Sequence, residues 1–135
     1  MGIFGAIDGG GMTATSLAEH IEEICRQHQI QVENHSRGGR AFRKSRRVAI
    51  RPVKTSITYA IALHELGHVL GGQQHGIRLD AECGAWLWAK ENAKIWTEAM
   101  ERTMQKSLRS YVTWAKRHKT AKCPVDHQIF ELLGS

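Results

Sequence analysis

The segment His64-Glu65-Leu66-Gly67-His68 places a glutamate directly after the first of two histidines that stand four positions apart. Residues i and i+4 of a helix lie on one face, so both imidazoles could reach the same metal ion. The glutamate would then stand beside a metal-bound water, where it could act as a general base. This HExxH pattern predicts a zinc peptidase in which His64 and His68 are ligands and Glu65 is the catalytic base.

The residues around the motif favour a helix with one apolar side. The run Ser56 to Leu63 contains neither Gly nor Pro, and Gly71-Gly72 predicts the end of the helix. Apolar residues recur at helical spacing on the face away from the histidines: Ala60, Leu63, Leu66 and Leu70. An apolar back and a front with two histidines would suit a metal site. The alternative is a core helix whose histidines only form hydrogen bonds.

A catalytic zinc usually has three protein ligands and one water, so a third ligand is expected. His75, Asp80 and Glu82 are the candidates. The pattern HExxHxxGxxH would place a third histidine at Gln74, one residue before His75. Asp80 suits a helix cap or a supporting partner, because acids are favoured at a helix start. We favour Glu82, because the small residues Cys83-Gly84-Ala85 after it would let two helices approach closely beside the metal.

The motif and the later segment Asp80-Ala81-Glu82-Cys83-Gly84-Ala85-Trp86-Leu87-Trp88-Ala89 resemble the ImmA/IrrE family of small metallopeptidases, in the form found in phages and mobile elements. The resemblance covers about residues 28 to 100. It implies a gluzincin-like site, in which Zn²⁺ is held by His64, His68 and a glutamate of the next helix. The family usually shows Glu-Ala-Asn where this chain has Glu82-Cys83-Gly84. That departure leaves Asp80 open as an alternative to Glu82.

The expected reaction is hydrolysis of a peptide bond in a protein substrate, with Glu65 moving a proton from the zinc-bound water to the leaving amine. A donor to the oxyanion is also expected, and Tyr59, Tyr111 and His127 are candidates. The family resemblance implies that the substrate is a transcriptional repressor. A DNA-dependent protease similar to the SprT/Spartan group is an alternative. A non-catalytic, zinc-stabilised nucleic-acid-binding protein is another.

Basic residues are concentrated between Arg37 and Lys54, whereas the whole chain has a net charge of +6. They are Arg37, Arg40, Arg43, Lys44, Arg46, Arg47, Arg51 and Lys54. Such a ribbon could contact DNA, or steer an acidic or DNA-bound protein toward the site. It could equally be a solvated edge strand, because charged side chains keep sheet edges from pairing with other chains. An edge strand beside the motif could also bind an extended peptide by strand addition.

The expected fold class is α+β: an N-terminal helix, a small basic antiparallel hairpin or sheet, the HExxH helix and a long C-terminal helical segment. Thr15 or Ser16 would cap the first helix, whose apolar stripe is Leu17, Ile21 and Ile24. The alternation from residue 30 to residue 50 predicts two antiparallel strands joined at Gly38-Gly39. After Trp86, apolar residues at helical spacing predict one very long helix or two in succession.

At 135 residues the chain predicts a single zincin-like metallopeptidase domain, residues 15–135, after a flexible glycine-rich leader, residues 1–14. The three cysteines form no CxxC pair, which fits a reducing compartment. No apolar run approaches the ~20 residues of a membrane span, and the N-terminus lacks the basic start of a secretory signal. We therefore expect no membrane partner and a cytoplasmic location, in a bacterial host or encoded by a phage.

Overall fold

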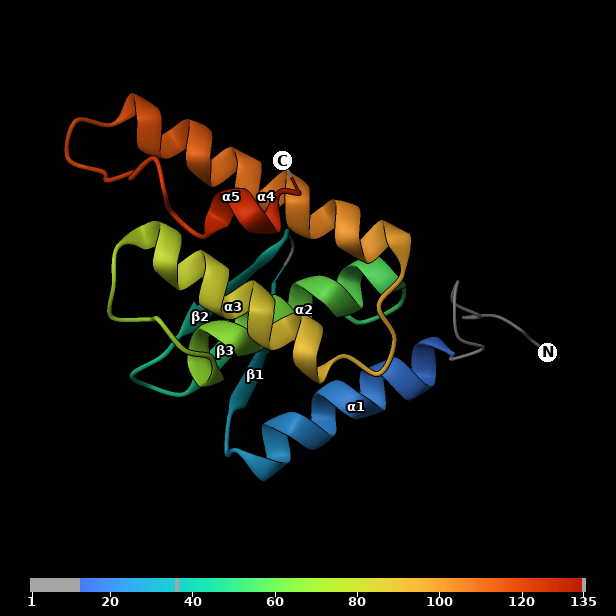
Figure 1. Ribbon diagram of the computed structural model, residues 1–135. Coiled ribbons are helices and arrows are strands. Elements are labelled where there is room, and N and C mark those ends of the chain that lie inside the picture. Colours follow the sequence, from blue (N-terminus) through green and yellow to red (C-terminus); the bar gives the residue numbers. More distant parts are fainter. Residues whose placement is uncertain (1–12, 36, 135) are drawn as a thin grey trace.

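A computed structural model describes residues 13–35 and 37–134, and its architecture is α+β, as predicted (Figure 1). The elements are α1 (Ala14–Gln27), β1 (Gln31–Asn34), β2 (Gly39–Phe42), β3 (Arg47–Ile50), α2 (Ser56–Leu70), α3 (Arg78–Asn92), α4 (Glu98–Arg117) and α5 (Ile129–Leu132). Most of the predicted leader lies outside the described residues, and α1 already begins at its last residue, Ala14.

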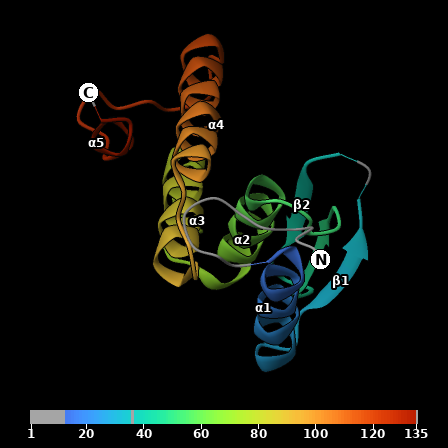
Figure 2. The same cartoon turned by 90° about the vertical axis from the view of Figure 1, so that its right-hand side faces the viewer.

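Helix α2, which carries the HExxH motif, lies at the centre of the fold. The sheet covers one side of it, α3 and α4 cover the opposite side, and α1 packs along a third side (Figures 1 and 2). Ala60, Leu63 and Leu66 are fully buried, as predicted, but His64 and Glu65 are buried too. The helix is therefore enclosed on nearly all sides and does not have the single apolar side that was predicted, because apolar residues stand around most of its circumference.

The sheet is mixed, with strand order β1-β3-β2, so the predicted pairing across Gly38-Gly39 is wrong. β1 pairs with β3 in parallel, with Val32 opposite Val48, and β2 pairs with β3 antiparallel, with Ala41 opposite Val48. The hairpin turn is residues 43–46, between β2 and β3. β3 lies between the other two strands of the sheet, and its residues Val48, Ala49 and Ile50 are all buried, whereas every residue of β1 is exposed.

Helix α1 begins two or three residues earlier than predicted, because Thr13 caps it by accepting a hydrogen bond from the Ser16 N–H. Its predicted apolar stripe is buried. His20 joins α1 to α2, since its Nδ1 lies 2.7 Å from the Tyr59 hydroxyl. The same hydroxyl accepts the Lys94 N–H at 3.0 Å, so it links both α1 and the segment after α3 to α2.

The long C-terminal helical segment is two successive helices, α3 and α4, which was one of the two predicted alternatives. Thr97 begins the second helix by accepting the Met100 N–H. The buried stripe of α4 is Met100, Met104, Leu108, Val112 and Ala115. Among the described residues, no helix combines the length and apolar character that crossing a bilayer requires.

Candidate metal centre

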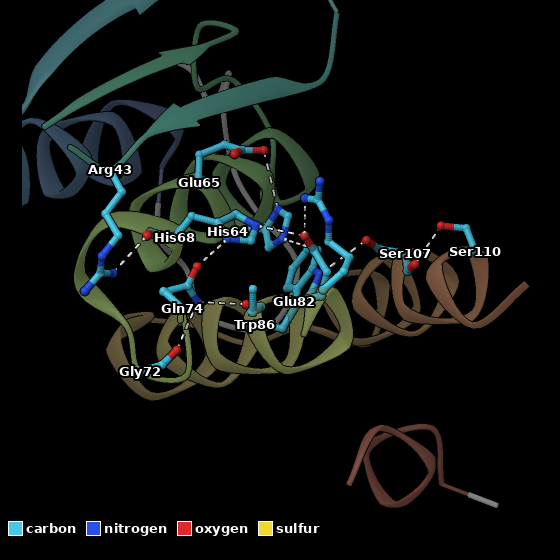
Figure 3. Close-up of polar contacts among 12 residues, drawn as sticks. Arg43, His64, Glu65, His68, Gly72, Gln74, Glu82, Trp86, Ser107 and Ser110 are labelled. Atoms are coloured by element: carbon cyan, nitrogen blue, oxygen red, sulfur yellow. Dashed lines mark hydrogen bonds and ion pairs between the residues drawn. The ribbon is translucent and has the colours of Figure 1, made fainter. Parts of the chain in front are cut away.

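The imidazoles of His64 and His68 both face the carboxylate of Glu82, which reaches them from α3 (Figure 3). His64 Nε2 lies 2.9 Å from Glu82 Oε1, and His68 Nε2 lies 3.1 Å from Glu82 Oε2. Glu82 is 1% exposed. Local helix geometry pairs the histidines on one face, and the packing of α3 against α2 adds the carboxylate.

The spacing of these atoms suits a zinc ion. Two ligands about 2.0–2.1 Å from zinc at the tetrahedral angle stand about 3.3 Å apart. The observed separations of 2.9 and 3.1 Å are within a few tenths of an ångström of that value. Glu82 Oε2 is buried and has no hydrogen-bond partner among the described residues, although His68 Nε2 is adjacent. A bound cation would satisfy this oxygen, so the donor set fits a metal.

The motif by itself also forms a possible donor group, since ligand atoms of His64, Glu65 and His68 lie within 4.8 Å of one another. This group is not specific to zinc. Glu65 Oε2 lies 3.5 Å from Nδ1 of His64, the ring atom remote from Glu82. The Glu65 carboxylate thus faces the far side of the His64 ring, whereas Glu82 faces the Nε2 atoms of both histidines.

Without a metal, the imidazole of His64 and the carboxylate of Glu82 form an ion pair. Burial opposes a charge on His64, but the carboxylates of Glu65 and Glu82 outweigh it and raise the pKa of the imidazole. Burial likewise disfavours the Glu82 carboxylate, but His64 and His68 outweigh it and lower its pKa. The site thus keeps a negative oxygen facing two ring nitrogens, and a metal that binds there must displace the His64 proton.

Helices α2 and α3 approach closely because small residues meet where they cross, as the sequence predicted for Gly84 and Ala85. A Cβ atom on Gly67 would stand 2.2 Å from the Ala85 carbonyl oxygen. A Cβ on Gly84 would stand 2.0 Å from the Gly72 carbonyl oxygen. Larger residues at either position would push α3, and Glu82 with it, away from the histidines.

The other two candidate ligands have different surroundings. Asp80 caps α3, because its Oδ2 accepts the Ile77 N–H at 3.1 Å, while its Oδ1 lies 2.6 Å from His127 Nε2. His75 is exposed and does not line the site. Cys83, beside Glu82, is buried, and burial raises the pKa of its thiol to about 12, with the Asp80 and Glu82 charges adding to the effect. Its thiol therefore stays protonated at neutral pH.

The base of the motif, Glu65, lies against the edge strand β2. A Cβ atom on Gly39 would stand 2.8 Å from Glu65 Cγ and 3.1 Å from Oε2, so only glycine leaves room for this side chain. Between β2 and the helices is a cavity of about 790 Å³. It is lined by residues 39–43, His64, Glu65, His68, Gln74, Gly76, Arg78, Ala81, Glu82 and Tyr111.

Of the candidate oxyanion donors, only Tyr111 lines this cavity. Burial raises the pKa of Tyr111, and the Glu82 carboxylate raises it further, so the phenol keeps its proton. Tyr59 is fully buried and bonded to His20 and Lys94, and His127 is bonded to Asp80. Neither Tyr59 nor His127 lines the cavity.

Three arginines of the predicted basic segment bond to other parts of the fold. Arg43 donates to the carbonyls of His68 and Val69 at 3.1 Å, which ties the end of β2 to the end of α2. Arg46 donates to the His28 carbonyl, and Arg47 pairs with Glu33 at 3.0 Å. The remaining basic side chains are exposed: Arg37, Arg40, Lys44, Arg51 and Lys54.

Three residues of the site were not anticipated from the sequence. Trp86 stacks on the His64 ring with centroids 4.3 Å apart, Gln74 Oε1 lies 2.9 Å from His68 Nδ1, and Arg78 lies 3.7 Å from Glu82 Oε2. Only Arg78 carried a local signal, because it precedes Glu82 by one helical turn. Trp86 is also part of the hydrophobic core, since its side chain is 1% exposed.

Comparisons with protein-family models, with curated proteins and with solved structures found no match to this chain. The candidate site therefore depends on the motif and on its geometry.

Proposed function

We propose that this protein is a zinc-dependent endopeptidase that hydrolyses a peptide bond in a protein substrate. The observation that supports it best is the meeting of His64, His68 and Glu82, with Glu65 adjacent, at the wall of a cavity beside an edge strand. This combination provides three metal donors, a base and a place for a substrate.

Each polar residue of the site would have a separate role in the reaction. His64, His68 and Glu82 would hold the ion, which when bound supplies a Lewis acid for the scissile carbonyl and the attacking water. Glu65 would take a proton from that water and pass it to the leaving amine nitrogen. Tyr111 and Arg78, which line the same cavity, would stabilise the negative charge that develops on the carbonyl oxygen.

The edge strand β2 would hold the substrate in an extended form. It pairs with β3 on one side only, and its residues Gly39 to Phe42 line the cavity. A peptide that adds to the open edge would lie across the face of Glu65. This arrangement favours an unfolded or flexible protein segment over a folded surface.

We infer from the resemblance to ImmA/IrrE proteins that the substrate is a transcriptional repressor. The exposed basic side chains Arg40, Lys44 and Arg51 favour a partner that is acidic or bound to DNA. A DNA-dependent protease is therefore the second candidate. Its distinguishing property would be cleavage that requires added DNA and weakens steeply with salt.

The test compares the parent protein with Glu65→Gln on a mixed peptide library, with zinc content measured for both by elemental analysis. We expect both proteins to bind zinc near one equivalent and only the parent to cleave, since a general base contributes about 10²–10⁴-fold. Equal cleavage by Glu65→Gln would remove the role assigned to Glu65. A parent that binds no zinc after reconstitution would refute the proposal.

A further inference from the structure

The side chain of Gln74 is held in one orientation by the backbone around it. Its Nε2 donates to the Gly72 carbonyl at 2.9 Å (Figure 3). It also donates to the Ala81 carbonyl at 2.8 Å. An amide turned the other way would place its oxygen against two carbonyl oxygens. The amide oxygen must therefore face the third neighbour, His68 Nδ1, at 2.9 Å.

This orientation determines where a neutral His68 carries its proton. Because Gln74 Oε1 can only accept, His68 Nδ1 must be the donor, and Nε2 is left with a free lone pair. That lone pair lies on the side of Glu82, whose Oε2 is 3.1 Å away and has no hydrogen-bond partner among the described residues. Both atoms are therefore ready to bind a cation.

Gln74 also joins the two helices that supply the ligands. It follows α2, which carries His68, and it bonds to Ala81, the residue of α3 directly before Glu82. One amide thus orients a ligand ring and fixes the loop between the ligand helices. In the pattern HExxHxxGxxH this position holds a third histidine ligand, but here its side chain reaches the opposite ring nitrogen of His68.

We propose that Gln74 is a positioning residue that sets the tautomer and the ring orientation of His68 for metal binding. This inference rests on the proposed function, because it assigns a residue to the same zinc site. Partners of this kind typically change metal affinity by about 10- to 100-fold when they are removed.

Three variants separate the role in orienting His68 from a role in the loop alone. Gln74→Met removes both the acceptor and the donors at similar size. Gln74→Glu keeps an acceptor toward His68 but loses the donors to Gly72 and Ala81. His75→Ala is the matched control, since its side chain is exposed on the same loop.

Zinc affinity is measured for each variant by competition with a chromophoric chelator, and folding by thermal unfolding. We expect about 10- to 100-fold weaker binding in Gln74→Met and no change in His75→Ala. Gln74→Glu should also weaken binding, because its second oxygen would face the carbonyl oxygens of Gly72 and Ala81. Unchanged affinity in Gln74→Met would overturn the inference.

Nitrogen-15 NMR of the imidazole of His68 gives a second readout that needs neither metal nor activity. In the metal-free parent, under conditions in which the ring is neutral, the proton should reside on Nδ1. In Gln74→Met the two tautomers should mix. A parent ring protonated on Nε2 would overturn the inference even if Gln74→Met failed to fold. A parent that binds no zinc but keeps the Nδ1 tautomer would instead refute the proposed function and leave the hydrogen bond established.

Discussion

Replacing Gly67 with alanine tests whether the close approach of α2 and α3 creates the metal site. The added Cβ would lie 2.2 Å from the Ala85 carbonyl oxygen and 2.8 Å from Ala85 Cα. α3 would have to withdraw by about 1 Å to restore ordinary contact distances. Zinc sites tolerate departures of about 0.2 Å in ligand distance, so Glu82 would leave the reach of the histidines.

The effect on stability should be smaller than the effect on metal binding. Alanine favours a helix interior over glycine by about 1 kcal/mol, while overpacking costs about 1–3 kcal/mol. We therefore expect the free energy of unfolding to fall by about 0–2 kcal/mol. Losing a residue that only supports a ligand can weaken metal binding about 100-fold. Losing the ligand Glu82 itself should weaken zinc binding at least as much.

Zinc affinity of Gly67→Ala is measured by chelator competition and its stability by denaturant unfolding of the metal-free protein. Gly72→Ala is the control, because a Cβ at that position meets no atom within 4 Å. The control should match the parent in both measurements. If Gly67→Ala binds zinc as tightly as the parent, Glu82 is not held in place by this helix contact and the reasoning fails.

Two further predictions concern Glu65 and the link between α1 and α2. Gly39→Ala should displace the Glu65 carboxylate, because the new Cβ would lie 2.8 Å from Glu65 Cγ. Peptidase assays should then show a lower kcat at unchanged zinc content. The control is Gly38→Asn, whose Cβ meets no atom within 4 Å and which should leave kcat intact. Equal kcat in Gly39→Ala would argue against this position for Glu65. Burial lowers the pKa of His20 below 6.5, with the nearby Lys94 charge adding to the effect, so the folded state prefers the neutral ring, which bonds to the Tyr59 hydroxyl. Its contribution to stability is complete above pH 6.5 and is lost as the pH falls from there through the lowered pKa. Urea unfolding at several pH values should therefore show a smaller loss of stability in acid for His20→Asn, whose amide can still bond to Tyr59 but does not titrate. The same acid loss in the variant and the parent would contradict the assignment.

The helix and its paired histidines could be predicted because both depend on short-range geometry. Residues four positions apart share a helix face in any fold, and Gly71 ends the helix as its sequence position indicates. The stripe of α1 was predicted for the same reason. The strand pairing was not, because β1 pairs in parallel with β3, and no local pattern determines that β3 rather than β2 becomes its neighbour.

Glu82, the third ligand that we propose, lies between these cases. The small residues near Glu82 indicated a close helix contact, but Asp80 and His75 had compatible positions in the sequence. Tertiary packing separated them, since Asp80 bonds to Ile77 and His127, while His75 is exposed. The role of Gln74 could not be predicted from the sequence at all, because its three hydrogen-bond partners belong to different segments.

The sequence by itself determined the chemistry that this protein can offer, two imidazoles and a carboxylate on one helix, because helical periodicity depends only on neighbouring residues. The tertiary structure alone decided which distant groups complete that chemistry. Glu82 reaches the histidines only because glycines allow α3 to approach α2, and Glu65 faces an open strand only because β2, not β1, lies at that edge of the sheet. Contacts of this kind depend on how whole elements pack, which no local pattern specifies.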